Sequence, residues 1–198
     1  MIYRDYIKRI LDFCGAVVLS PIVGAVCLVF GPIIYAEDHG PIFYLAKRRG
    51  KDGKVFNMYK LRSMKVNAPD IRNEDNSTFN SEDDPRVTHI GKIMRRTSID
   101  ELPQIFNVFK GDMSFIGPRP ITTNRPLEDY DEDMKIRLKV RPGITGHVQA
   151  YVRNSVPQKE KFRDDAEYTE HVTFLGDVKI LFKTITSVFE HKNIYTNS

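Results

Sequence analysis

The sequence lacks the features that mark disulfide-stabilised and nucleic-acid-binding proteins. Its 198 residues include only two cysteines, and 30 Lys and Arg against 26 Asp and Glu leave a formal charge of +4. Cys14 and Cys27 both lie in one apolar stretch, where we interpret them as small hydrophobic residues rather than a disulfide or a metal site. The excess charge is too small and scattered to predict a nucleic-acid-binding face.

Several common catalytic motifs are also missing. No GxxxxGK[ST], HExxH or GxSxG pattern occurs, which disfavours the P-loop nucleotide, zinc protease and α/β-hydrolase classes. No internal repeat is present. The length predicts one domain, with room for an appendage.

One long uncharged segment, residues 13–36, stands out against an otherwise polar chain. As a continuous helix it extends roughly 36 Å, enough to cross a hydrocarbon core of about 30 Å. It exceeds the usual apolar core of a signal peptide and has no convincing small-x-small cleavage site, so a cleaved signal is disfavoured. We therefore expect this segment to meet a bilayer.

Two features suggest that the segment does not simply cross. Pro21 removes a helical hydrogen bond, so a kink is expected at Ser20-Pro21, with the Ser20 hydroxyl satisfying a freed carbonyl. Positive residues flank both ends, Lys8 and Arg9 before it and the cluster at 47–51 after it. A helix that enters, bends and leaves on one face fits this pattern, while a single-pass anchor with a tolerated proline stays open.

Asp12 follows Lys8 by one helical turn. We expect it to pair with Lys8 or Arg9 at the membrane interface. The alternative is an exposed ion pair of little energetic weight.

The remaining elements predict an α+β fold. Apolar stretches at 42–45 and 55–59 flank a Gly-containing turn at 50–53, which is typical of a β-hairpin. The predicted helices are two short ones within 90–110, one at about 127–140, one at 160–171 and an amphipathic one at 174–189, whose apolar face packs either on the core or on a membrane surface. Residues 67–85 form a long polar loop, and 111–126 and 141–147 are irregular.

The residues at 97–104 carry the strongest chemical signal. Ser98 precedes Glu101 by three positions, a capping-box pattern that predicts the start of a helix. Asp100 and Glu101 then lie in the first turn, where the helix dipole stabilises carboxylates and phosphates are also bound. Arg95 comes just before. The purely structural alternative is that the two acids only cap the helix.

Two loops rich in glycine and proline hold arginines. They are Gly117-Pro118-Arg119-Pro120 and Arg141-Pro142-Gly143. Arginines on rigid loops suit bidentate recognition of phosphate oxygens. Together with one nucleophilic and one Mg²⁺-binding carboxylate, they suit phosphoryl transfer.

These motifs, in this order, resemble those of the monotopic phosphoglycosyl transferases, a family of bacterial sugar transferases. The resemblance covers nearly the whole chain. Its elements are Lys8-Arg9-Ile10-Leu11-Asp12, Ser20-Pro21, Tyr59-Lys60-Leu61-Arg62-Ser63-Met64, Asp84-Pro85-Arg86-Val87-Thr88, Asp100-Glu101-Leu102-Pro103-Gln104, Gly117-Pro118-Arg119-Pro120 and Arg141-Pro142-Gly143-Ile144-Thr145-Gly146. The chain is most similar to the minimal form, and within it to the diacetylbacillosamine-phosphate transferases.

The resemblance implies a reaction. A sugar-1-phosphate passes from a UDP-sugar to polyprenol (undecaprenyl) phosphate with Mg²⁺, and UMP is released. Asp100 would hold the phosphosugar covalently and Glu101 would bind Mg²⁺. The residues expected to bind substrate phosphates are Arg95, Arg119, Lys60 and Arg62, and those expected in the site loops are Gly117, Pro118, Pro120, Arg141, Gly143 and Gln149.

It also implies an arrangement at the membrane. Residues 1–40 would form a re-entrant helix broken at Ser20-Pro21, and residues 41–198 a catalytic domain with interfacial helices on the cytosolic face of the bacterial inner membrane. Glycosyltransferases that extend the product would be partners. His147 stands where many members have Trp, so the sugar stays open. A polyprenyl-diphosphate phosphohydrolase and a non-catalytic membrane-anchored module are the alternatives.

Overall fold

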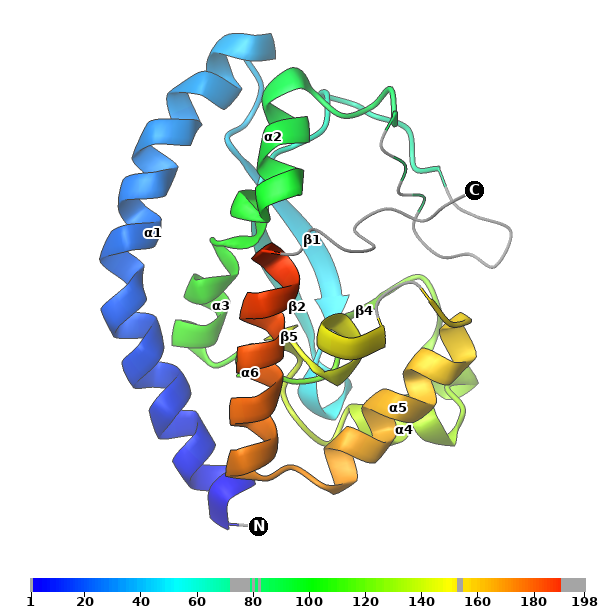
Figure 1. The fold of residues 1–198 in the computed structure, drawn as a ribbon. Helices are drawn as coiled ribbons and strands as arrows, with labels where there is room; N and C mark the ends of the chain where they lie inside the picture. The colour runs from blue at the N-terminus through cyan, green and yellow to red at the C-terminus, as the bar shows by residue number, and fades with distance from the viewer. Residues whose placement is uncertain (1, 72–78, 80, 82, 153–154, 190–198) are drawn as a thin grey trace.

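The computed structural model describes residues 2–71, 79, 81, 83–152 and 155–189, and it confirms the α+β class. A long helix, α1 (Lys8–Asp38), preceded by a π-helical turn (Tyr3–Ile7), bows along one side of the molecule, and the shorter elements pack inside this bow (Figure 1). This segment, Tyr3–Asp38, is the one described helix that is long and apolar enough to cross a membrane.

Helix α1 continues through both of its prolines, Pro21 and Pro32. The Ser20 hydroxyl donates to the Val17 carbonyl at 3.0 Å. Val17 lies four residues before Pro21, so its carbonyl is the one that the proline leaves without a backbone donor. The predicted role of Ser20 is confirmed. The helix is not interrupted at this point, however, and a re-entrant path stays a prediction.

The predicted hairpin is confirmed and extended. Strand β1 (Phe43–Arg49) pairs antiparallel with β2 (Val55–Leu61) around a short 3-10 turn (Lys51–Gly53), and β4 (Ile121–Thr122) adds to the other edge of β1. Strands β3 (Ser114–Ile116) and β5 (Gly143–Thr145) form a separate parallel pair. The sequence analysis had interpreted these last segments as irregular, and their partners lie too far apart in the chain for a local signal.

The helices follow the predicted order with changed bounds. Two short helices, α2 (His89–Thr97) and α3 (Gln104–Lys110), lie where two were expected. The helix expected at 127–140 is a 3-10 turn (Leu127–Asp129) followed by the short α4 (Glu132–Arg137). A π-helical turn (Val148–Val152) precedes α5 (Gln158–Glu170) and α6 (Phe174–Phe189). Residues 72–78, 80 and 82 of the loop predicted at 67–85 lie outside the described residues.

Helix α1 packs on the other elements along its length. Ala16 and Val23 are buried in one cluster with Val108, and Ile34 is buried in another with Met94. Because buried aliphatic contacts recur from the first half of the helix to its last turn, α1 is part of the packed core and not a separate anchor.

Polar contacts fix the N-terminal end of α1. Lys8 Nζ lies 2.5 Å from Asp177 Oδ2, and Arg9 donates to the carbonyls at the end of α3 at 2.6 and 3.0 Å. The Asp12 carboxylate accepts from the Ser114 hydroxyl at 3.1 Å and from the Phe115 backbone N–H at 3.0 Å. The expected pairing of Asp12 with Lys8 or Arg9 is therefore wrong, because each of these side chains bonds to another part of the fold.

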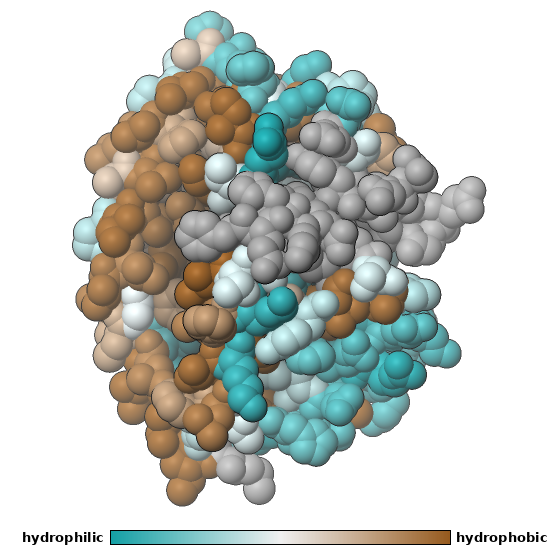
Figure 2. Space-filling view, in the orientation of Figure 1, coloured by the Kyte–Doolittle hydropathy of each residue, from teal (hydrophilic) through white to brown (hydrophobic). Residues whose placement is uncertain are grey.

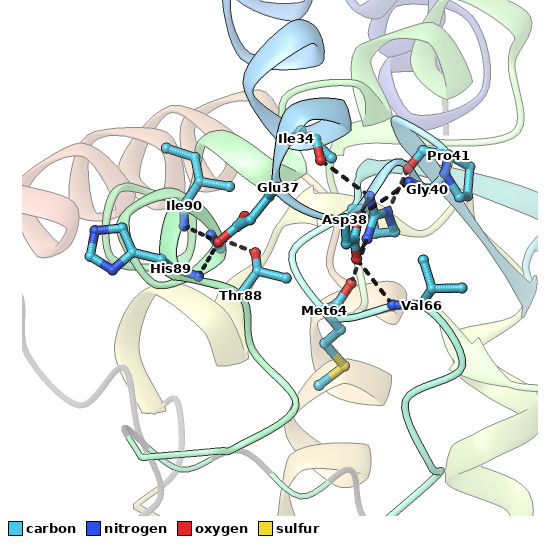
Figure 3. Close-up of polar contacts among 12 residues, drawn as sticks. Ile34, Glu37, Asp38, Gly40, Pro41, Met64, Val66, Thr88, His89 and Ile90 are labelled. Carbon is cyan, nitrogen blue, oxygen red and sulfur yellow. Dashed lines mark hydrogen bonds and ion pairs between the residues drawn. The ribbon is translucent and has the colours of Figure 1, made fainter.

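The C-terminal end of α1 is fixed in the same way (Figure 3). The Asp38 carboxylate accepts hydrogen bonds from both terminal nitrogens of Arg62, at 2.5 and 2.6 Å. The Glu37 carboxylate accepts a hydrogen bond at 2.6 Å from the backbone N–H of His89, which is the first residue of α2. The ion pairs of Lys8 with Asp177 and of Asp38 with Arg62 therefore tie both ends of α1 to the same domain.

Helix α6 exposes its apolar face. Leu175 and Phe182 are each 70% exposed, whereas Asp177 and Ile180 are buried, and the Thr184 hydroxyl bonds to that of Thr145 at 2.7 Å. The interpretation that the apolar face packs on the core is wrong. Figure 2 shows hydrophobic residues gathered over α1 and α6 on the visible side of the molecule. An apolar surface of this extent is typical of an interaction site.

Candidate active site

Asp100 and Glu101 lie in a 3-10 turn (Ile99–Glu101) between α2 and α3. The predicted capping box is wrong, because Ser98 takes a left-handed conformation (φ 56°) that ends α2, and its side chain makes no cap bond. Of the two helices that flank this turn, α2 begins with a side-chain cap, in which the Thr88 hydroxyl accepts from the Gly91 N–H at 3.1 Å, and α3 does not. The turn therefore presents two neighbouring carboxylates without using them as caps.

The two carboxylates have different surroundings. Asp100 is 8% exposed, whereas the Glu101 side chain keeps 30% of its surface and binds Lys60 Nζ through Oε1 at 2.6 Å. Lys60 comes from strand β2, so the hairpin supplies the cation. Asp100 is thus desolvated, whereas Glu101 is paired with Lys60 and partly accessible to solvent.

Their pKa values are displaced in opposite directions. Burial raises the pKa of Asp100 above its ordinary value, the nearby Glu101 charge raises it further, and Lys60 and Arg95 oppose this. Burial also acts to raise the pKa of Glu101, but Lys60 and Arg119 outweigh it and lower that pKa to about 2. Adjacent acids with separated pKa values are typical of catalytic sites.

The charges of three of the four predicted phosphate-binding cations act on this pair: Lys60 on both acids, Arg95 on Asp100 and Arg119 on Glu101. Arg95 is held by a bond from Nε to the Ser63 hydroxyl at 3.0 Å. Arg119 is exposed on its loop. The structure places the fourth, Arg62, elsewhere, because the residue is 7% exposed and its guanidinium bonds to Asp38 and to backbone carbonyls near the end of α1. Arg62 therefore belongs to the contacts at the end of α1.

Glycines hold the two predicted site loops together. The Gly117 N–H donates to Thr145 at 2.9 Å, and the Gly143 N–H donates to Pro118 at 3.0 Å. A Cβ on Gly117 would lie 2.4 Å from the Arg141 carbonyl oxygen, and one on Gly143 only 2.1 Å from the Gly117 nitrogen. Only residues without a side chain permit this approach. The contact fixes the backbone that carries Arg119.

The other predicted loop residues lie close to this contact. Arg141 Nε donates to the Gly111 carbonyl at 2.9 Å. Pro118 is buried, Pro120 is half-buried, and Gln149 approaches Gly146, whose Cβ would lie 3.0 Å from its side-chain oxygen. These contacts shape the loop that carries Arg119.

Sequence analysis missed a pair that supports Arg119. Arg137 and Asp165 form an ion pair at 2.8 Å, with side chains 3% and 2% exposed. Arg137 also donates to the Arg119 carbonyl at 2.9 Å. Burial is the main cause that raises the pKa of Asp165 and lowers that of Arg137. Because the two residues lie on α4 and α5 and are 28 positions apart, no local pattern indicates their contact.

Known proteins share this sequence pattern. The family model for bacterial sugar transferases matches residues 3–191. Relatives include the galactosyl transferase CpsE of Streptococcus agalactiae, 40% identical over 91% of this chain, and the undecaprenyl-phosphate galactose phosphotransferase of Salmonella typhimurium, 37% identical over 96%. The chain spans 42% of the length of each of these two proteins.

A shorter relative is covered almost completely. The exopolysaccharide production protein ExoY of Sinorhizobium fredii is 34% identical, and the match spans 95% of this chain and 88% of that protein. The family match includes α1, the carboxylate turn and both loops. The chain therefore belongs to the bacterial sugar transferase family.

Proposed function

We propose that this chain transfers a sugar-1-phosphate from a UDP-sugar to undecaprenyl phosphate and releases UMP. Family membership and the named activities of relatives, among them a galactose phosphotransferase and an N-acetylgalactosaminephosphotransferase, support the reaction class. The observation that carries the proposal is the Asp100-Glu101 pair, with pKa values displaced in opposite directions, among three cations suited to phosphate.

Asp100 acts as the nucleophile. A carboxylate oxygen of Asp100 attacks the sugar-proximal phosphorus of the donor, and the bond to the UMP oxygen breaks, which leaves an aspartyl-phosphosugar and free UMP. An oxygen of undecaprenyl phosphate then attacks the same phosphorus, and the Asp100 carboxylate is released. Lys60, Arg95 and Arg119 stabilise the phosphate charge in both steps.

Glu101 is suited to hold Mg²⁺. Such sites use one or two protein carboxylates with substrate phosphates and water completing the shell. Glu101 fits because Lys60 and Arg119 keep it ionised and because part of its side chain is accessible. The metal would neutralise phosphate charge, while this chain's own cations orient the donor.

The enzyme is embedded in the bilayer without crossing it. Its apolar surface over α1 and α6 suits lipid, and both ends of α1 are tied to the same domain by contacts of Lys8 and Asp38. A crossing helix would place its two ends on opposite faces of the membrane, so contacts from both ends to one domain support a path that does not cross. The domain faces the cytosol at the bacterial inner membrane, and glycosyltransferases extend its product.

Transfer is tested with purified protein, UDP-sugars, Mg²⁺ and undecaprenyl phosphate. Wild type should release UMP. The rate of UMP release by Asp100→Asn should be lower by more than about 1,000-fold, since this change removes the nucleophile. Asp83→Asn makes the same change on a side chain that is 95% exposed and should retain activity. Full turnover by Asp100→Asn contradicts the covalent mechanism.

Two further readouts separate the alternatives. A donor labelled in its sugar-proximal phosphate should label wild-type protein in the absence of acceptor, but not Asp100→Asn. A phosphohydrolase instead releases inorganic phosphate from polyprenyl diphosphate without nucleotide sugar. A non-catalytic module predicts that Glu101→Gln alters thermal stability and that no turnover exists.

Topology is tested by cysteine accessibility. Ile2→Cys and Tyr44→Cys, 72% and 55% exposed in wild type, flank α1 and are placed in a background without Cys14 and Cys27. Both should react with an impermeant reagent from the same face of sealed vesicles. Reaction from opposite faces contradicts the non-crossing arrangement.

A further inference from the structure

A basic pocket lies at the N-terminal end of α1. It is a small hollow that is partly open to solvent, and it shares none of its lining with the carboxylate turn or the cations around it. Its charged lining consists of two carboxylates, Asp5 and Asp12, and six cations: Arg4, Lys8, Arg9, Lys51, Lys139 and Arg141. These come from α1 and the turn before it, the hairpin turn, and the segment between α4 and β5.

Three of the cations are held in place by the fold. Lys8 is paired with Asp177, and its side chain is 12% exposed. Arg9 and Arg141 donate to backbone carbonyls, at 2.6 Å to Val108 and 2.9 Å to Gly111. A carbonyl is neutral, so these bonds orient the guanidinium groups and leave their charge uncompensated.

The carboxylates offset only part of this charge. Asp12 is occupied by the Ser114 hydroxyl and the Phe115 N–H, and Asp5 pairs with Arg4 at the surface. Lys51 is half-buried and Lys139 is exposed. Gathering like charges in one concave site is unfavourable unless an anion enters it. Fixed arginines match the tetrahedral oxygens of phosphate in particular.

The position of the pocket indicates the source of the phosphate. Ile7, Ile10 and Leu11 are 44%, 62% and 47% exposed on the same turns as the cations, and Phe174 of α6 contacts Tyr3 at 5.7 Å between ring centroids. The basic lining thus adjoins the apolar surface. A lipid whose chains lie on that surface would bring its headgroup phosphate to the cations.

We propose that this pocket binds the phosphate of an anionic phospholipid headgroup. The proposal rests on the membrane association proposed above. It assigns the pocket a role separate from the substrate phosphates, which belong to the Asp100-Glu101 site. The same chemistry would accept free inorganic phosphate, and the experiment distinguishes the two sources.

Binding is measured by flotation of the full chain with neutral phosphatidylcholine vesicles and with vesicles containing about 30% phosphatidylglycerol, whose negative surface attracts cations. Wild type should bind both and prefer the anionic vesicles. The double variant Lys51→Gln/Lys139→Gln should lose about 30-fold in affinity for anionic vesicles and nothing for neutral ones, at about tenfold per 1.4 kcal/mol and about 1 kcal/mol for each cation.

A matched control separates a site from diffuse attraction. Lys92→Gln/Lys135→Gln removes the same charge from exposed positions outside the pocket and should change anionic binding far less. Equal losses in the two double variants would overturn the proposal. Wild type that binds neutral vesicles without any anionic preference would also overturn it while leaving membrane association intact, whereas binding to neither vesicle would overturn both.

The free-anion arm uses inorganic phosphate in lipid-free detergent, read by thermal shift against chloride at equal ionic strength. Weak stabilisation, in the millimolar range, is expected for an isolated phosphate without its lipid chains. Micromolar binding that the Lys51→Gln/Lys139→Gln variant abolishes would assign the pocket to free phosphate and overturn the lipid assignment.

Discussion

Removing one member of the Arg137–Asp165 pair should destabilise the chain strongly. Both side chains are at least 97% buried, and Asp165→Asn would leave the Arg137 guanidinium without its counter-charge. Losing one partner of a buried ion pair costs about 3–5 kcal/mol. At about 2–4 °C per kcal/mol for a domain of this size, the melting temperature should fall by about 6–20 °C.

The functional consequence is tested by a second variant. Arg137→Met combined with Asp165→Leu removes both charges and should recover most of the stability, because a packed apolar pair often replaces a buried ion pair without loss. It does not restore the bond to the Arg119 carbonyl. UMP release should therefore stay impaired in a folded protein, chiefly through a higher KM for the donor.

The assay is thermal unfolding in detergent, followed by UMP release on the variants that fold. Asp83→Asn is the control, since its pairing with Lys92 at 3.8 Å is exposed and should contribute less than about 1 kcal/mol. An Asp165→Asn variant with wild-type stability would refute the reasoning on the buried charge. A double variant with wild-type KM would refute the role assigned to the Arg119 loop.

Two smaller perturbations follow. Gly117→Ala should destabilise by about 1–3 kcal/mol in denaturant titrations, because its Cβ would lie 2.4 Å from a backbone oxygen, whereas Gly24→Ala, with no described atom within 4 Å, should be neutral or stabilising by up to about 1 kcal/mol. Equal effects would contradict the packing argument. The lowered pKa of Glu101 stabilises the folded state above its unfolded pKa of about 4.5, and this contribution is lost as the pH falls towards about 2. In Glu101→Gln the free energy of unfolding should therefore depend less on pH in this acidic range than in wild type. The same pH dependence in both proteins would contradict the pairing of Glu101 with Lys60.

The local features of the fold were predictable from sequence. The hairpin around Gly50, the two helices on either side of Asp100, and the bond of Ser20 next to Pro21 all depend on neighbours within a few residues. Such patterns are visible because turn residues and hydrophobic periodicity act over short distances. The carboxylate pair was found for the same reason.

The errors concern side chains with two competing partners. Ser98 had the spacing of a cap, yet it ends the preceding helix, and Glu101 pairs with Lys60 instead. Asp12 had a cation one turn away, yet it bonds to β3. A local sequence pattern predicts a partner that the side chain could bond. The partner that it does bond depends on which segment the fold places nearby.

The orientation of α6 illustrates a further limit. Its periodicity predicted an amphipathic helix correctly, but periodicity alone does not say which face is inside. Here the polar side chain of Asp177 turns inward because Tyr3, Lys8 and Tyr168 bond to it, at 2.5 to 2.7 Å. The apolar residues are therefore left outside.

The ion pair between Lys8 and Asp177 also limits when α1 can reach its final position during synthesis of the chain. Its two partners are 169 positions apart, so α1 cannot be locked at its N-terminal end until α6 has been made. Contacts of such separation form late and slowly. Until then the apolar surface of α1 has no finished domain beside it, and we expect the nascent chain to depend on early contact with lipid or a chaperone to reach its folded state.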